Sequence, residues 1–213
     1  SYSCFIDSDS QPIPGTQAAR LNNIDIAYLM RYNPLGNGSA AVYRRQVLEG
    51  IQFQQSVQGI GQTAYFDEEL RMSQDIEVLR RIILKTDWSI EGIPTILTMY
   101  RINPNSVSSN FDKKVKIWQQ LFSKTYVLNP ELLAPYQSIS KAYELKYLAR
   151  RAIRLRHGLA ALQLIGQSLQ SNWKILLEEP KTVLAIALAA GALCLMPNPL
   201  YVRLEAVGMT LKA

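Results

Sequence analysis

The stretch 65–82 carries the residues best suited to acid–base chemistry, because it combines several carboxylates with a helical pattern. The pattern consists of three apolar residues at the i, i+3, i+7 spacing of one buried helix face: Ile76, Leu79 and Ile83. It predicts a helix from about Gln74 to Leu84, with Ser73 as its N-cap. Asp75 then lies in the first turn, where unpaired backbone N–H groups and the helix dipole favour the ionised carboxylate. A general base must be ionised before it can accept a proton.

An acid near a helix start also has a purely structural interpretation. It stabilises the helix by about 0.3 to 1 kcal/mol, and the helix position of Asp75 taken alone favours this interpretation. Glu77 is predicted either to face solvent or to pair with Arg81 at i+4. The choice between a general base and a helix-stabilising acid therefore depends on the motifs around Asp75.

Residues Asn33–Ser39 form a second segment of interest. Gly36 and Gly38 permit backbone conformations and close approaches that side chains forbid, so a loop is predicted here. A helix is predicted within Ala40–Phe53, and Arg44 and Arg45 lie in that region. The segment is either a ligand-binding loop or a structural turn that precedes a solvated helix.

A third candidate is the Asp7-Ser8-Asp9 sequence, which follows a predicted strand over Tyr2–Ile6. Paired carboxylates suit Mg²⁺ or Mn²⁺, so Asp7 and Asp9 could form a metal motif. The following residues, Gln11–Gly15, are rich in turn formers and look like a hairpin tip. We therefore favour a hairpin over a metal motif.

The elements that position these residues alternate between strands and helices up to about residue 110. Trp88–Ile90 and Thr95–Ile102 are predicted strands, and Ile24–Met30 is a strand or a short helix. From Asp112 onward the apolar spacing is helical, and it includes an antiparallel pair joined near Gly158 whose second helix covers residues 159–177. The sequence thus predicts an α/β region over 1–110 and an all-α helical region over 111–213.

The run Thr182–Met196 contains 15 uncharged residues and ends at Pro197. A membrane-spanning helix needs about 20 apolar residues. We therefore predict a buried helix packed on the preceding pair, or an interfacial segment, and no transmembrane span.

Four separated motifs carry a family resemblance. In chain order they are Gly36-Asn37-Gly38-Ser39 followed by Arg44-Arg45, then Phe66-Asp67-Glu68, then Gln74-Asp75, and last Tyr100-Arg101. Their order and spacing resemble those of family-2 glycosyltransferases. In that family a glycine/serine loop and an arginine-bearing helix precede a Phe-Asp-Glu turn, an acidic pair that opens a helix, and a strand that ends in Tyr-Arg. The resemblance covers about residues 1–110.

The resemblance implies a partial GT-A type, Rossmann-like α/β sandwich and an inverting enzyme that uses a nucleotide-sugar donor and a divalent metal. Inversion is a single displacement, in which a carboxylate takes the proton of the attacking acceptor hydroxyl. By its position in the motif, that carboxylate is Asp75. The family usually has Glu-Asp where this chain has Gln74-Asp75, so the base is kept, and we expect activity to survive the change.

The resemblance also implies which residues contact donor or acceptor: Gly36, Asn37, Gly38, Ser39, Arg44, Arg45, Asp67, Glu68, Gln74 and Arg101. For Asp67 and Glu68, ordering of the turn and a solvated charge run remain alternatives. Many relatives have a metal-binding His two residues beyond the Tyr-Arg, where this chain has Asn103. We therefore expect the Mg or Mn ligands to lie mostly outside this chain, in a nucleotide-binding half before residue 1. The fragment alone is expected to be inactive.

The charge of the chain is uneven. Of its formal net charge of +6, residues 1–111 contribute 9 Lys+Arg against 11 Asp+Glu, a net of −2, and residues 112–213 contribute 14 against 6, a net of +8. The basic part lacks finger-like Cys/His spacing and aromatic-interleaved strands, so nucleic acid is not expected as a partner. A peripheral membrane surface is the preferred partner of the basic tail.

The composition, 48% hydrophobic and 19% charged, is that of a globular protein. Cys4 and Cys194 lie far apart, so neither a disulfide framework nor a thiolate metal site is predicted, and a reducing, cytoplasmic location fits best. No signal peptide is recognised. The expected function is sugar transfer to a glycan or lipid-linked acceptor in polysaccharide, glycolipid or cell-surface glycan assembly. The alternative is a non-catalytic helical module for interaction or membrane docking.

Overall fold

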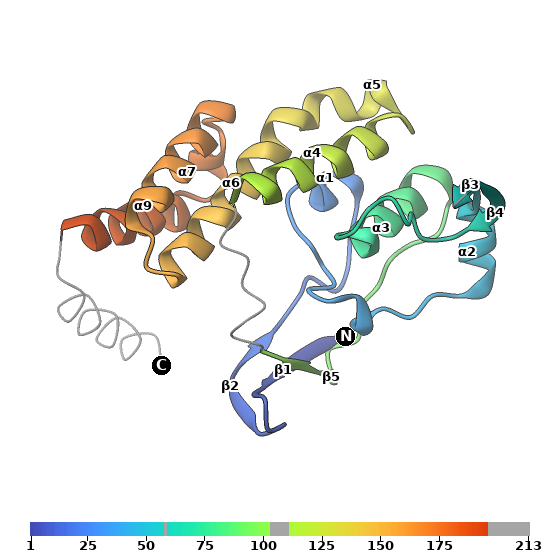
Figure 1. The fold of residues 1–213 in the computed structure, drawn as a ribbon, viewed down its shortest axis with the longest axis horizontal. Helices are drawn as coiled ribbons and strands as arrows, with labels where there is room; N and C mark the ends of the chain where they lie inside the picture. The colour runs from blue at the N-terminus through green and yellow to red at the C-terminus, as the bar shows by residue number, and fades with distance from the viewer. Residues whose placement is uncertain (58, 103–110, 196–213) are drawn as a thin grey trace. The chain divides into compact units, whose positions relative to one another are not determined.

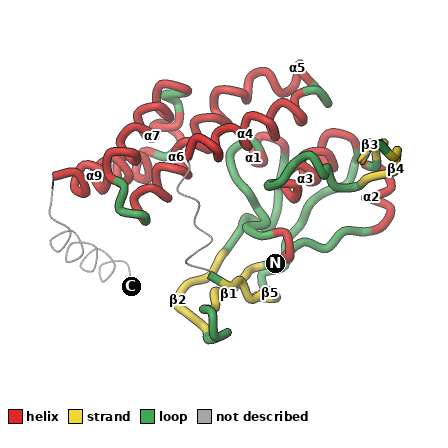
Figure 2. Tube along the Cα trace, in the orientation of Figure 1, coloured by secondary structure: helices red, strands yellow, loops and turns green. Residues whose placement is uncertain are grey.

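A computed structural model describes residues 1–57, 59–102 and 111–195 of the chain (Figures 1 and 2). The chain forms two compact units, Ser1–Tyr136 and Gln137–Ala213. Among the described residues, the first unit is mixed α/β with two small sheets and the second is helical. The coarse prediction of α/β followed by helices is therefore confirmed.

The three-stranded sheet of the first unit has the order β2-β1-β5. Its strands are β1 (Tyr2–Ile6), β2 (Pro12–Gln17) and β5 (Ile96–Arg101). β1 pairs antiparallel with β2 and parallel with β5. The parallel pairing requires a crossover, which the elements between β2 and β5 provide. The predicted hairpin is confirmed, although its turn precedes Pro12 instead of following it.

The second sheet is a hairpin that the sequence interpretation missed. It consists of β3 (Phe53–Val57) and β4 (Ile60–Ala64), which pair antiparallel. Its sequence is rich in glutamine and glycine and has no clear alternation of apolar and polar residues, so the pattern does not predict strands here. Gly59, with φ of +82°, was the available turn signal.

Short helical elements and the long helix α3 form the first core of this unit. They are α1 (Ile26–Leu29), η1 (Gly38–Ala40), α2 (Arg45–Ile51) and α3 (Gln74–Lys85). The apolar face of α3 packs against α1 and α2. The buried residues of this core are Ile24, Leu29, Val47, Ile51, Val78, Leu79 and Ile82. The packing fixes the rotation of α3, and with it the direction of Asp75.

The helix α4 (Phe111–Tyr126) belongs to the first unit, together with α5 (Pro130–Leu133) and η3 (Ala134–Tyr136). Trp118 and Phe122 pack with Met30 and Leu133 in a second core. The compact units therefore divide after residue 136, whereas the sequence division was set at 110. The physical reason is that the apolar stripe of α4 is buried against the α/β elements.

The second unit contains α6 (Gln137–Arg154), α7 (Gly158–Ser171), α8 (Ile175–Glu178) and α9 (Pro180–Leu195). α7 packs against both α6 and α9. The predicted helical hairpin is confirmed, but its second helix ends at Ser171, and α8 follows separately. None of the helices in the described residues is both long and apolar enough to cross a membrane.

One local prediction was wrong, and a second was right in position only. Trp88–Ile90 is irregular instead of a strand; close to it, Gly92 N donates a hydrogen bond to Leu21 O. Ser73 does precede α3, but its backbone is left-handed with φ of 66° and its side chain makes no capping hydrogen bond.

Candidate functional site

The predicted base lies at the start of α3, beside the glycine loop. Asp75 is the second residue of α3, and its Oδ1 accepts a hydrogen bond from Ile76 N at 2.9 Å. Its other oxygen, Oδ2, accepts no hydrogen bond from the described residues. A Cβ added to Gly38 would lie 3.7 Å from the Cβ of Asp75 and 4.0 Å from its Oδ2. The missing side chain at position 38 thus leaves space beside a carboxylate oxygen that is open to a ligand.

The glycine loop is held in place by its asparagines. Asn33 Oδ1 accepts hydrogen bonds from the backbone N–H groups of Leu35 and Gly36, which forms an Asx turn. Gly36 follows with φ of +72°, a conformation that favours glycine. Asn37 donates through Nδ2 to Ser3 Oγ at 2.9 Å, which ties the loop to β1. Gly38 and Ser39 remain exposed.

An aromatic pair connects the other motifs to Asp75. Tyr43, just after the loop, meets Phe66 edge to face with ring centroids 6.1 Å apart. Burial, together with the negative charge of Asp75, raises the pKa of Tyr43 to about 12. Tyr43 therefore keeps its hydroxyl proton at neutral pH and can donate a hydrogen bond. Sequence interpretation gave Tyr43 no role, although its position directly after the glycine loop was a usable signal.

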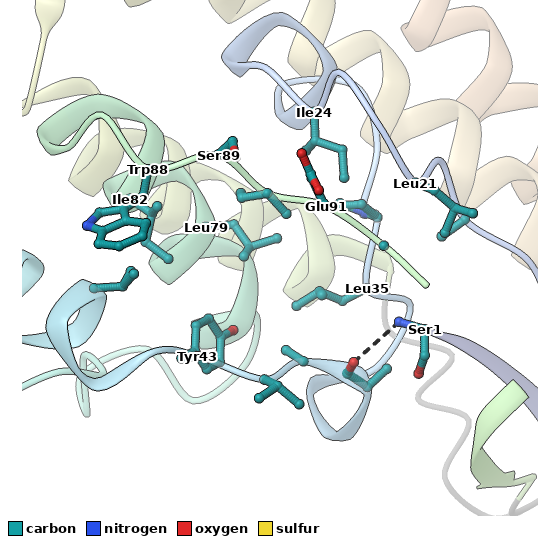
Figure 3. Close-up of a pocket in the computed structure, with 18 of the residues that line it drawn as sticks. Ser1, Leu21, Ile24, Leu35, Tyr43, Leu79, Ile82, Trp88, Ser89 and Glu91 are labelled. Carbon is teal, nitrogen blue, oxygen red and sulfur yellow. Dashed lines mark hydrogen bonds between the residues drawn. The ribbon is translucent and has the colours of Figure 1, made fainter. Parts of the chain in front are cut away.

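Tyr43 also lines a pocket of about 210 Å³ (Figure 3). Leu79 and Ile82 of α3 contribute apolar surface to it, and Trp88 lies across from Tyr43. The backbones of Leu21 and Gly92 approach closely at this pocket, since a Cβ at Gly92 would lie 3.1 Å from the Leu21 Cα. Tyr43 is therefore shared between an apolar pocket and the carboxylate of Asp75.

The two arginines after the loop differ in their surroundings. Arg44 lines the pocket, and its guanidinium lies 5.9 Å from the centre of the Trp88 ring. Arg45 points to solvent and pairs with Glu49 at 3.0 Å on the same helix. Of these two arginines, Arg44 is thus the one positioned to contact a ligand in the pocket.

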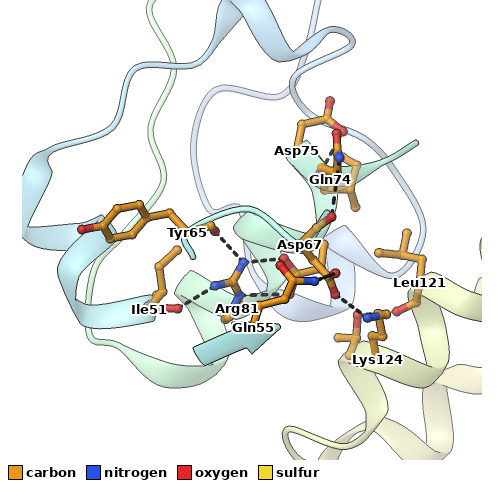
Figure 4. A network of polar contacts seen from close by, with 12 residues as sticks. Ile51, Gln55, Tyr65, Asp67, Gln74, Asp75, Arg81, Leu121 and Lys124 are labelled. Carbon is orange, nitrogen blue, oxygen red and sulfur yellow. Dashed lines mark hydrogen bonds and ion pairs between the residues drawn. The ribbon is translucent and has the colours of Figure 1, made fainter. Parts of the chain in front are cut away.

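Asp67 lies in a structural network instead of an open site (Figure 4). Its carboxylate accepts hydrogen bonds from Gln55 Nε2 at 3.0 Å, from Glu69 N at 3.0 Å and from Lys124 Nζ at 2.5 Å. Burial opposes its ionisation, but the hydrogen bonds from Lys124, Glu69 and Gln55 outweigh burial and lower the pKa of Asp67. These contacts favour the turn-ordering interpretation of Asp67 over contact with an acceptor.

The residues next to Asp67 extend this network. Glu68 is exposed, and its carboxylate accepts a hydrogen bond from Gln62 Nε2 at 3.3 Å. Gln74, which replaces the first acid of the family motif, donates to the Asp67 carbonyl at 3.5 Å. In Figure 4 the side chain of Asp75 points away from Arg81 and Lys124.

A buried ion pair within α3 ties this helix to neighbouring segments of the chain. The guanidinium of Arg81 binds the carboxylate of Glu77 at 2.9 and 2.5 Å and donates to the carbonyls of Ile51 and Tyr65 at 2.6 and 2.8 Å. It also lies 4.6 Å from the centre of the Phe53 ring. Glu77 therefore pairs with Arg81 as one prediction stated, but it does not face solvent.

Arg101 fastens the β1–β2 turn, away from the glycine loop. Its guanidinium donates to the carbonyls of Asp7 and Ser8 at 2.6 and 2.8 Å and to Ser10 Oγ at 2.9 Å. The Asp7 carboxylate accepts from Asp9 N and from Gln11 N at 2.9 and 2.8 Å, as in an Asx turn. Arg101 and Asp7 therefore stabilise the hairpin turn through these contacts.

No group of three or more His, Cys, Asp or Glu side chains in the described ranges is arranged to hold a metal ion. His157 precedes α7 in the helical unit. Asn103, the position considered for a metal ligand after Tyr100-Arg101, lies outside the described residues.

Comparisons with known proteins gave no family, no relative and no fold neighbour. No family model, no curated protein and no solved structure matches this chain. The arguments for function therefore come from the residues and their geometry.

Three of the four motifs meet at the start of α3. Gly38 from the loop, Phe66 from the acidic turn through its contact with Tyr43, and Asp75 from α3 lie together. The fourth motif, with Arg101, lies at the hairpin turn. The site that the geometry defines therefore consists of Gly38, Tyr43, Phe66 and Asp75, with the adjoining pocket.

Proposed function

We propose that this chain supplies the acceptor side and the catalytic base of an inverting glycosyltransferase of the GT-A type. The observation that carries the proposal is the open carboxylate oxygen of Asp75 beside the side-chain-free Gly38. An inverting transfer needs one such group within hydrogen-bond reach of the acceptor hydroxyl. The four-motif resemblance supplies the reaction type, and the meeting of three of these motifs in space supports it.

Each group at the site has a role on this proposal. Asp75 Oδ2 takes the proton of the acceptor hydroxyl as that hydroxyl attacks the anomeric carbon, and the nucleoside diphosphate leaves from the opposite face. Tyr43 donates a hydrogen bond that orients the acceptor, since its raised pKa keeps the proton in place. The pocket behind Tyr43 holds part of the acceptor beyond the reacting hydroxyl.

On this proposal, the nucleotide-sugar donor and the divalent metal, Mg or Mn, bind to a nucleotide-binding half outside the residues of this chain. The acceptor is a glycan or a lipid-linked glycan, and the reaction takes place in the cytoplasm. The free thiols of Cys4 and Cys194 support a reducing compartment.

The test is turnover of the nucleotide-sugar donor by a protein that contains this chain and the donor-binding half. Asp75→Asn is expected to lower turnover by roughly 10² to 10⁴. Asp112→Asn is the control, because Asp112 is also an acid at the second position of a helix but is exposed and lies outside the site. Turnover by the Asp75→Asn variant close to that of the control would refute the assignment.

A second measurement tests the proposal that the donor and metal bind outside this chain. The chain alone is expected to bind nucleoside diphosphate and Mn²⁺ weakly in calorimetry. Tight binding would instead assign donor contacts to this chain and return Asp7 and Asp9 to consideration as metal ligands.

A further inference from the structure

The helix α9 has an unusual outer face. In a globular protein the solvent side of a helix normally carries charged or polar residues. Three leucines of α9 are instead exposed: Leu184 by 55%, Leu188 by 73% and Leu195 by 86%. At roughly 100° per residue these positions fall within an arc of about 40°, so they form one stripe along the helix.

The opposite side of α9 is the one that packs inside the protein. Val183, Ile186 and Ala190 are buried, and α9 contacts α7 and α6. The leucine stripe therefore lies on the side that its own unit does not cover in the described residues. Exposed apolar surface of this kind marks a binding face for a protein or a membrane.

Positive charge lies at both ends of the stripe. Lys174 and Lys181 are exposed near the N-terminal end of α9. At the other end, a Cβ added to Gly158 would lie 2.8 Å from Leu193 Cβ, so the first residue of α7 packs against the last turn of α9. The exposed Arg154 is four residues before Gly158 in the chain, so it lies near the C-terminal end of α9.

The positive charges of this unit outnumber its negative charges. Residues 137–195 contain eight Lys+Arg and three Asp+Glu. Glu179 is bound to Lys146 at 2.7 Å, and Glu178 accepts a hydrogen bond from the Tyr143 hydroxyl at 2.8 Å. The helical unit that carries the leucine stripe therefore has an excess of positive charge.

We propose that the outer face of α9 docks on a lipid bilayer that contains anionic headgroups. The leucines enter the boundary between headgroups and acyl chains, to a depth of about 5–10 Å, while the flanking cations contact the headgroups. Trp173, which is exposed just before α8, adds a side chain that favours the membrane interface.

A second copy of the chain fits this face less well. Two stripes packed antiparallel would place the Lys174 and Lys181 end of one copy against the Arg154 end of the other. Like charges would then face each other at both ends of the interface, which opposes association. An anionic bilayer complements the same pattern.

The test uses the full 213-residue chain and sedimentation with vesicles of phosphatidylcholine, with or without phosphatidylglycerol. We expect binding to the anionic vesicles, weaker binding to the neutral ones, and loss of most binding at about 1 M NaCl. Leu188→Glu is expected to lower the partition coefficient roughly tenfold or more. Val127→Glu is the control, because Val127 is 76% exposed on the first unit, and it should bind like wild type.

The charge requirement has its own pair of variants. Lys174→Glu combined with Lys181→Glu should weaken binding to anionic vesicles, and Lys116→Glu on α4 should have little effect. Circular dichroism of each variant verifies that the helices are intact.

Three outcomes would overturn the proposal. They are absence of vesicle binding by wild type, equal binding by Leu188→Glu and Val127→Glu, and equal binding to neutral and anionic vesicles. Ultracentrifugation without lipid adds a fourth: a wild-type dimer that Leu188→Glu converts to a monomer would assign the face to a second copy instead.

Discussion

Removal of the Arg81 guanidinium should destabilise the first unit strongly. Arg81 is 2% exposed and Glu77 is 7% exposed. Arg81→Met would leave the Glu77 carboxylate buried without its cation, and the carbonyls of Ile51 and Tyr65 without a donor. Breaking a buried ion pair from one side costs about 3–5 kcal/mol. That is a large part of the roughly 5–15 kcal/mol that stabilises a typical domain.

The assay is urea unfolding followed by tryptophan fluorescence. Trp88 and Trp118 lie in the first unit and Trp173 in the second, so a Trp173→Phe background makes the signal report the first unit. Glu77→Gln and the double variant complete a mutant cycle. We expect the double variant to lose clearly less than the sum of the two single losses, because removal of both charges leaves neither one buried alone.

The chain offers an internal control for this cycle. Arg45 and Glu49 are also an i, i+4 pair on a helix, at 3.0 Å, but their side chains are 88% and 50% exposed. The same substitutions there should change the unfolding free energy by about 0.5 kcal/mol or less. A loss below about 1 kcal/mol for Arg81→Met, or equal losses at the two pairs, would refute the reasoning from burial.

Three further predictions concern the site and its supports. Because the Asp67 pKa is lowered in the folded state, its contribution to stability is present above pH about 4 and lost as pH falls through the folded pKa. Asp67→Asn should flatten that part of the urea-unfolding pH profile, whereas an unchanged slope would contradict the network with Lys124. The Tyr43 hydroxyl should ionise near pH 12 in an ultraviolet titration that uses Tyr43→Phe as the reference. Asp75→Asn should lower the pKa of Tyr43. Ionisation of Tyr43 near pH 10 would exclude the buried environment beside a negative charge. Gly36→Ala should cost about 1–2 kcal/mol, because φ at this position is +72°, and a neutral effect in thermal unfolding would contradict the left-handed loop.

The local elements that hold the candidate base could be predicted from the residue pattern. The strand Tyr2–Ile6 was predicted from a short run before a segment rich in turn formers, and the helix that begins at Gln74 and the helical character after residue 111 follow from the helical spacing of apolar residues. The structure confirms all three. The position of Asp75 in the first turn of α3 also follows, because it depends only on where the helix begins.

Which motifs meet and which polar groups are buried depends on packing between segments that are distant in the chain. Gly38 and Asp75 are 37 positions apart, and their contact depends on how α3 packs in the core. Glu77 turns inward because Arg81 finds carbonyl partners at Ile51 and Tyr65, far along the chain. A charge can be buried only where such distant partners satisfy it, and the spacing of residues along one helix does not contain that information.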